Sequence, residues 1–265
     1  LIDNFMVAGL GDAKMAAVNV ANQVNFVYLV VLWTLCGAGG IYLAQSRSAN
    51  DAEGMKQAYR FKTLMALIIS TIYFVILWTI PERLIAMMTM GNSAQAEIVS
   101  HGADYLRLIS FTLFPIALST AIGTALREIG LPRIPLVISV ISTLINTLGN
   151  YILIYGNLGA PRLEITGAAI ATITARLVEV GAFLVYIRLK NIDFYVPFSQ
   201  LHHIKPKLMG EILGKSGMMV LSETTWVVSE TVVTALYNSR GGAEVVAGMA
   251  AGWTIANIFF LVFGG

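Results

Sequence analysis

Residues 61–80 read FKTLMALIISTIYFVILWTI and contain a single charged side chain, Lys62. A helix needs about 20 predominantly apolar residues to cross a bilayer core of about 30 Å, so this stretch has the length and composition of a transmembrane helix. Alternating segments of about ten residues, which a transmembrane barrel requires, do not occur here. We therefore predict an all-α integral membrane protein, a polytopic bundle with eight such stretches at residues 1–9, 13–45, 61–80, 102–126, 134–155, 166–188, 216–238 and 244–265.

The overall composition excludes several classes of function. Of the 265 residues, 57% are hydrophobic and 12% are charged, and the mean hydropathy is +0.74, whereas soluble globular chains are about 25% charged. A net charge of +2 offers no one-signed surface for nucleic acid, and the single cysteine, Cys36, excludes an internal disulfide framework. The nucleophile, zinc-protease and phosphate-loop motifs are missing, so we expect neither an enzyme nor an organic cofactor.

The distribution of basic residues predicts the orientation in the membrane. Together with Lys62, the connections at 46–60, 127–133 and 188–215 hold eleven of the 17 Lys and Arg residues. Short loops rich in Lys and Arg stay in the cytoplasm. We therefore expect a multi-pass protein of the plasma (inner) membrane with these three connections on the cytoplasmic side.

The longest polar connection predicts a division of the chain. It suggests an amino-terminal part at 1–190 with six helices, the first truncated, a cytoplasmic linker at 191–215, and the beginning of a second part at 216–265 with two helices. A weak repeat of four small residues at an offset of 230 agrees with two related halves, a common plan among transporters. Both ends of the chain are apolar, without a leader or an initiator Met, so we expect a fragment of a longer protein.

Polar side chains inside the predicted helices indicate where chemistry occurs. Asp3 has no basic neighbour in sequence, and an ionisable group in hydrocarbon is costly enough to count as a functional candidate. Asn146 and Asn150 lie four apart, as do Ala168 and Thr172, so each pair projects from one helix face. Their oxygens suit a hard cation, and the carboxylate alone suits a proton. The alternative is that the amides and the hydroxyl only join helices by hydrogen bonds.

Two further sets of polar residues lie inside predicted helices. Glu223 and Glu230 lie two turns apart on one helix face, where we predict a second protonation or substrate-cation site, or else burial against a helix beyond this chain. The cluster of Asn19, Asn22 and Gln23 is expected to line a wet cavity.

Two helices carry features that favour a structural role. Arg176 and Glu179 lie three apart on one helix and are expected to neutralise each other. Pro115 removes a backbone donor in mid-helix and is expected to produce a kink.

Four segments together resemble the MATE (multidrug and toxic compound extrusion) family, in their order and spacing as well as in residue type. They are residues 3–11 (DNFMVAGLG), 41–45 (IYLAQ), 126–130 (LREIG) and the run from Asn146 through Tyr151-Ile152-Leu153-Ile154-Tyr155-Gly156 to Thr172.

The resemblance implies a fold and a function. The fold would be twelve helices in two six-helix lobes, and the function the export of amphipathic, often cationic drugs in exchange for Na⁺ or H⁺ by alternating access. It implies that Asp3, Asn146, Asn150, Ala168 and Thr172 form the cation site of the first lobe. Some members have Asp where this chain has Asn150, so the coupling ion stays open. Glu223 matches an acidic position in one branch of the family, and Glu230 does not.

Partners follow from the same resemblance. We expect small organic substrates, membrane lipids and a monomer when full-length. One alternative is a lipid-linked oligosaccharide flippase of the same superfamily, which would need a basic cavity. Only Arg107 and Arg176 are intramembrane bases, since Lys14, Lys62 and Arg188 at the ends of predicted helices are counted with the loops. The other alternative is a membrane scaffold without transport.

Overall fold

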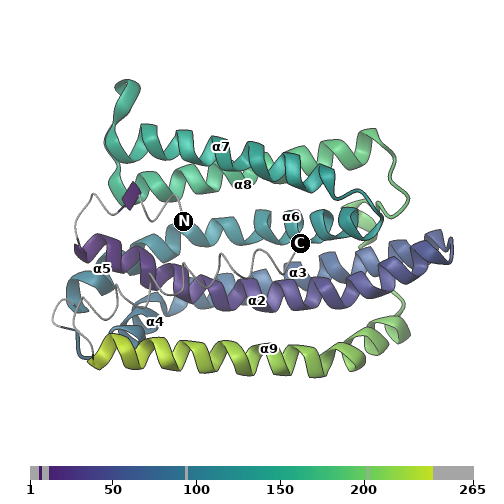
Figure 1. The fold of residues 1–265 in the computed structure, drawn as a ribbon, viewed down its shortest axis with the longest axis horizontal. Helices are drawn as coiled ribbons and strands as arrows, with labels where there is room; N and C mark the ends of the chain where they lie inside the picture. Colours follow the sequence, from purple (N-terminus) through teal and green to yellow (C-terminus); the bar gives the residue numbers. More distant parts are fainter. Residues whose placement is uncertain (1–5, 8–11, 93–94, 202, 241–265) are drawn as a thin grey trace.

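The architecture is taken from a computed structural model, which describes residues 6–7, 12–92, 95–201 and 203–240. Within these residues the chain is helical and contains no strand, as predicted. The helices lie side by side along the long axis of the molecule (Figure 1). They are α2 (Asp12–Ser48), α3 (Ala52–Thr79), α4 (Pro81–Met88), α5 (Gln95–Ile109), α6 (Leu113–Glu128), α7 (Arg133–Tyr155), α8 (Glu164–Leu189) and α9 (Pro206–Arg240).

Five segments of the described chain are long and apolar enough to cross a membrane. They are Lys14–Ser48, Ala52–Thr79, Gln95–Glu128, Arg133–Tyr155 and Glu164–Leu189. These segments match five of the predicted stretches, and the stretches at 1–9 and 244–265 lie outside the described residues except for Met6 and Val7. The stretch predicted at 216–238 is helical as part of α9, but α9 is not among the five.

The ends of α2 and α3 that meet at residues 48–52 differ from the prediction. Residues 46–60 were expected to form a loop, whereas α2 continues to Ser48 and α3 begins at Ala52. Asp51 terminates the intervening turn, because its side chain accepts a hydrogen bond of 2.9 Å from the backbone amide of Gly54. The charged residues of this region therefore lie on helices that extend beyond the apolar stretch.

The helix predicted around Pro115 is interrupted just before this residue. A 3-10 turn at Ser110–Thr112 separates α5 from α6, and Pro115 lies in the first turn of α6, where its missing amide costs no helical hydrogen bond. The hydroxyl of Tyr28 on α2 donates to the carbonyl of Leu113 at 2.9 Å and lies 2.8 Å from the hydroxyl of Ser70 on α3. This buried contact joins three helices at the break.

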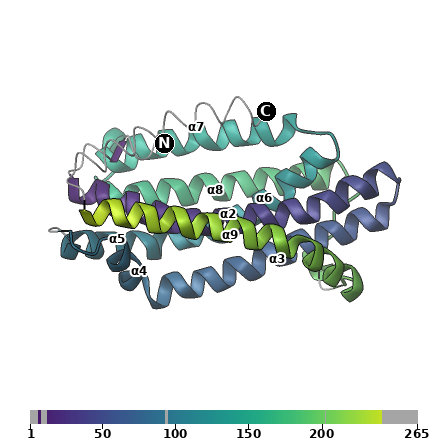
Figure 2. The same ribbon diagram turned by 60° about the horizontal axis from the view of Figure 1, so that its bottom comes forward.

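One apolar core holds helices α2 to α8, which we call the α2–α8 bundle. Its largest fully buried side chains include Leu32, Leu77, Leu106 and Leu113, which come from four different helices. The helix α9 packs against α2 at one side of this bundle, and the pair α7–α8 lies at the other, as the two views show (Figure 1 and Figure 2). The two predicted groups of site residues thus lie on opposite sides of the bundle.

Candidate functional site

The contact between α7 and α8 is close because small residues meet along it. A Cβ atom added to Gly149 would lie 3.0 Å from the Cβ of Ala171, and one added to Gly167 would lie 2.6 Å from the carbonyl oxygen of Leu153. Neither position leaves room for a larger side chain. Gly156, with φ 75°, ends α7 in the left-handed conformation that glycine adopts without strain, so the chain can turn back into α8.

Four of the five residues predicted for the cation site come together in this contact. Asn146 donates from Nδ2 to Thr172 Oγ1 at 3.2 Å, and Asn150 donates from Nδ2 to Asn146 Oδ1 at 3.4 Å. Thr172 donates to the carbonyl oxygen of Ala168 at 2.9 Å. We call these four residues the α7–α8 polar cluster. It concentrates amide, hydroxyl and carbonyl oxygens within an apolar helix pair, with Asn150 and Ala168 buried at 0% and 1% exposure.

Asp3, the fifth predicted residue, lies outside the described residues. The nearest described part of the chain is Met6, whose carbonyl oxygen accepts a hydrogen bond of 2.8 Å from the hydroxyl of Tyr155 at the end of α7. Val7 is fully buried in the same apolar core as Ile154 and Ala168. The described residues that follow Asp3 in sequence therefore pack against the helix pair that carries the cluster.

The predicted pairing of Arg176 and Glu179 is confirmed. Arg176 donates from NH1 to Glu179 Oε2 at 2.6 Å, and the glutamate side chain is 8% exposed. The two charges neutralise each other, and Arg176 follows Thr172 by one turn of α8. The contact agrees with the structural role that the spacing predicts, and that role stays a prediction.

The second group of predicted residues lies where α2 and α9 run side by side in opposite directions. Phe26 of α2 and Trp226 of α9 meet edge to face, with ring centroids 6.4 Å apart. Asn22 precedes Phe26 by four residues and Glu230 follows Trp226 by four, so both lie about 6 Å, four residues at 1.5 Å each, beyond the ring contact in the same direction. The structure thus brings Glu230 to the level of Asn22.

The members of this group differ in exposure. Glu223 and Asn19 are exposed, whereas Asn22, Gln23 and Glu230 are half-buried. Glu223 precedes Trp226 by three residues, so it lies on the other side of the ring contact from Glu230. There it is beside the apolar part of α2 around Leu29. Of the two glutamates, Glu230 is therefore the one that faces the polar cluster of α2.

One buried ion pair was not predicted. Lys62 on α3 donates from Nζ to both carboxylate oxygens of Glu128 on α6, at 2.8 and 2.6 Å, and its side chain is 0% exposed. Gly39 and Gly40 of α2 make space for it, since a Cβ atom at these positions would lie 2.5 Å from Lys62 Cγ and 2.0 Å from Glu128 Oε1. In the sequence, the only indication of this ion pair was that Lys62 is the lone charge in the apolar stretch 61–80.

These features define a class of protein. A multi-pass helical bundle that places polar residues at two helix interfaces, with the buried Lys62 paired to Glu128, is a construction found in membrane transporters.

The comparisons with known proteins give the family. The MatE family profile matches residues 1–152, and the chain belongs to this family of MATE transporters, which are not enzymes. This confirms the resemblance, the multi-pass membrane location and the expectation that the chain is not enzymatic.

Individual relatives agree. The chain is 31% identical over 222 residues to a probable multidrug resistance protein NorM of Synechocystis, covering 82% of this chain and 46% of the relative. It is 25% identical over 249 residues to a NorM of Thermotoga maritima, covering 93% of this chain and 52% of the relative. The chain thus spans about half the length of the curated relatives that it matches.

Solved structures share the fold. An inward-facing MATE multidrug resistance transporter superposes with a TM-score of 0.79 at 22% identity, covering 97% of this chain and 57% of that one. A Pyrococcus furiosus transporter of the MOP superfamily, described as having a binding pocket of reverse polarity that suggests a different function, superposes at 0.78 with 21% identity, covering 96% of this chain and 55% of that one. At these identities the likeness concerns the fold alone.

Proposed function

We propose that this chain is part of a cation-coupled antiporter that exports drugs or other amphipathic, often cationic compounds by alternating access. The observation that carries the proposal is the α7–α8 polar cluster, in which hydrogen bonds bring the oxygens of Asn146, Asn150, Ala168 and Thr172 together between two helices. Asp3 supplies the charge that this cluster lacks. Relatives described as probable multidrug resistance proteins support the substrate class.

The mechanism follows from neutralising a buried charge. When the outward-open protein takes up Na⁺ or H⁺ at Asp3, the carboxylate loses its net charge, the helix that carries it repacks, and the hold on the drug weakens. The drug leaves, and the protein returns after the cation departs to the cytoplasm. MATE structures described as inward-facing and outward-facing both share the fold of this chain, with TM-scores of 0.79 and 0.76. The protein works as a monomer with no organic cofactor.

Charge pairing disfavours the flippase alternative. A lipid pyrophosphate needs unpaired bases in the cavity, whereas Arg176 is paired with Glu179, and Arg107 is paired with Glu82 and lies 3.7 Å from Asp104. A hydrogen bond from its own backbone amide, together with Arg107, lowers the pKa of Glu82 below its usual range, so that Glu82 stays ionised as a partner. The described residues thus leave neither of these arginines free for a pyrophosphate.

The identity of the coupling ion is tested at Thr172. If the ion is Na⁺, Thr172→Val removes one oxygen from the cluster and raises the half-saturating Na⁺ concentration for efflux by roughly three- to tenfold, the effect of about 1 kcal/mol. Thr174→Val is the matched control, since Thr174 donates to the carbonyl of Ile170 at 2.9 Å, as Thr172 does to Ala168, but faces outward. Ion-dependent efflux in proteoliposomes measures both. Equal shifts in the two variants would remove Thr172 from the site.

The substrate-cation site is tested at the two glutamates of α9. Because Glu230 lies at the level of Asn22 and Glu223 does not, Glu230→Gln is expected to weaken binding of a cationic dye about tenfold, or about 1.4 kcal/mol, and Glu223→Gln by less than twofold. Fluorescence titration gives both affinities, and an uncharged dye is the internal control. A larger loss with Glu223→Gln would reverse the assignment.

A further inference from the structure

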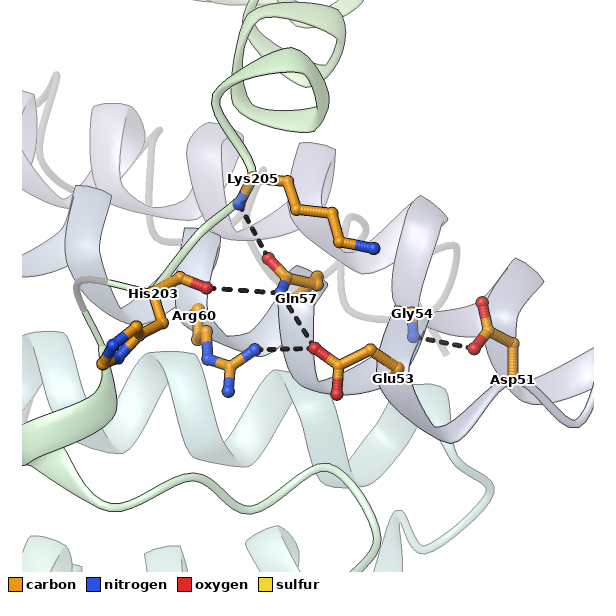
Figure 3. A network of polar contacts seen from close by, with 7 residues as sticks. All are labelled: Asp51, Glu53, Gly54, Gln57, Arg60, His203 and Lys205. Atoms are coloured by element: carbon orange, nitrogen blue, oxygen red, sulfur yellow. Dashed lines mark hydrogen bonds and ion pairs between the residues drawn. The ribbon is translucent and has the colours of Figure 1, made fainter.

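The connection between α8 and α9 is bonded to α3 through one side chain, Gln57 (Figure 3). Its Oε1 accepts a hydrogen bond of 3.0 Å from the backbone amide of Lys205, and its Nε2 donates to the carbonyl of His203 at 3.3 Å. Gln57 thus holds the backbone on both sides of Ile204. Its exposure is 4%, so water competes little for these bonds.

The orientation of the Gln57 amide is fixed from the other side. Its Nε2 also donates to Glu53 Oε1 at 2.9 Å, and the same oxygen accepts from Arg60 NH1 at 2.9 Å. All three residues belong to the first turns of α3 (Figure 3). The network leaves the amide one arrangement, in which its oxygen points at Lys205. We call Gln57, Glu53 and Arg60 the α3 clamp.

Apolar contacts continue this attachment into the beginning of α9. Ile212 is fully buried with Ala38 of α2 and with Phe61 and Met65 of α3, and Ile204 packs against the same group. Ser216 is 3% exposed. The connection and the first turns of α9 therefore belong to the α2–α8 bundle as one packed unit.

Beyond Ser216 fewer side chains of α9 are buried against the other described helices. Among the described side chains from Gly217 to Leu236, Val227 alone is buried, at 2% exposure. At Gly214 and Gly217 an added Cβ atom would meet no atom within 4 Å, so packing gives no reason for glycine there. Glycine lowers the stability of a helix relative to alanine. The helix α9 curves near its beginning and runs straighter towards its end (Figure 1 and Figure 2).

We propose that Gln57 is a positioning residue that fixes the beginning of α9 to the α2–α8 bundle, and that α9 bends at Gly214–Gly217 during transport. The loop before α9 then acts as a rigid attachment and the helix itself as the joint. This inference rests on the proposed alternating access. The glycines permit a change of backbone angle that other residues resist, and the clamp together with buried Ile212 holds the part of α9 that precedes them.

The attachment is tested without any transport assay. In Gln57→Leu the Lys205 amide loses its acceptor, and its hydrogen exchange rate in the complete protein is expected to rise at least tenfold. Gln45→Leu, at an exposed position near the end of α2, is the control and is expected to leave this rate unchanged. Unchanged exchange at Lys205 in Gln57→Leu would overturn the clamp.

The location of the joint is tested by distances between spin labels. One pair at Ser48 and Lys207 reports on the attachment, and another at Ser100 and Ser229 reports on the far end of α9; all four positions are exposed. Adding the coupling cation or a substrate is expected to change the second distance and not the first. A change in the first distance would place the joint in the loop, and no change in either would overturn the bending of α9.

The need for the glycines is tested by alanine. Gly214→Ala with Gly217→Ala is expected to lower the maximal rate of efflux at least threefold without changing substrate affinity, a split that a merely structural role would not produce. Gly181→Ala in α8 is the matched control, because its added Cβ atom also meets no atom within 4 Å. An unaltered maximal rate in the double variant refutes the joint. If the wild type itself shows no efflux, the proposed function fails while the exchange and distance results still decide the inference.

Discussion

Asp3→Asn is expected to abolish cation-driven efflux while leaving folding and membrane insertion intact. The substitution removes an intramembrane charge, so insertion costs no more than before. No group then remains in the cluster whose charge a cation could neutralise, because Asn146, Asn150 and Thr172 contribute only neutral oxygens. The loss in efflux rate should be at least about 100-fold, or about 2.7 kcal/mol. Drug binding is expected to survive.

The controls for this experiment come from the same chain. Asp104→Asn removes an exposed acid that lies 3.7 Å from Arg107, and it is expected to leave efflux unchanged. Asp3→Glu keeps the carboxylate and should retain partial activity if the ion is H⁺, and little if oxygens must fit around Na⁺. Efflux by Asp3→Asn at the wild-type rate, at matched expression and gradient, would move the coupling to Glu230 or Glu223.

The parts of the structure that depend on local sequence were predictable. Apolar stretches of about 20 residues gave the membrane-crossing helices. A spacing of four gave the common face of Asn146 and Asn150, and a spacing of three gave the pair of Arg176 and Glu179. In each case the interacting residues lie on one helix, so the helical period alone decides whether they meet. The meeting of Asn146 with Thr172 on a second helix was expected from the family resemblance.

The ends of helices that extend beyond the apolar stretches were harder to predict from the sequence. Composition marks where a chain leaves hydrocarbon, not where a helix stops, and α2 and α3 continue as helices past that point to the turn at Asp51. The same reason applies to α9, which begins at Pro206 within the linker predicted at 191–215. The division of the chain into two lobes at this linker stays a prediction.

Local sequence patterns could not predict contacts between residues that are distant in sequence. The linker meets Gln57 across 148 positions and Lys62 meets Glu128 across 66. No spacing rule connects such pairs. Lys62 was counted with the cytoplasmic loops because of its charge, whereas the structure buries it between α3 and α6. Burial became possible because Gly39 and Gly40 of α2 leave space for the pair.

Lys62→Ala is expected to destabilise the protein by about 3–5 kcal/mol, because it leaves the Glu128 carboxylate without its partner in an interior that water hardly reaches. Gly40→Ala should destabilise in the same sense, since the new Cβ atom would lie 2.0 Å from Glu128 Oε1. Gly37→Ala is the matched control on the same helix, with no atom within 4 Å of its added Cβ. Thermal unfolding in detergent, followed by tryptophan fluorescence, compares the three variants.

The double variant Lys62→Met with Glu128→Gln separates the charge from the space that it fills. Replacing both members of a buried ion pair by uncharged side chains of similar volume is often neutral or stabilising, whereas removing one member leaves a charge that must be buried alone. The double variant is therefore expected to unfold at a higher temperature than Lys62→Ala. If the double variant and Lys62→Ala unfold at the same temperature, the loss of stability in Lys62→Ala comes from a cavity and not from the unpaired carboxylate. If Lys62→Ala unfolds with the wild type, the pair does not hold α3 and α6 together.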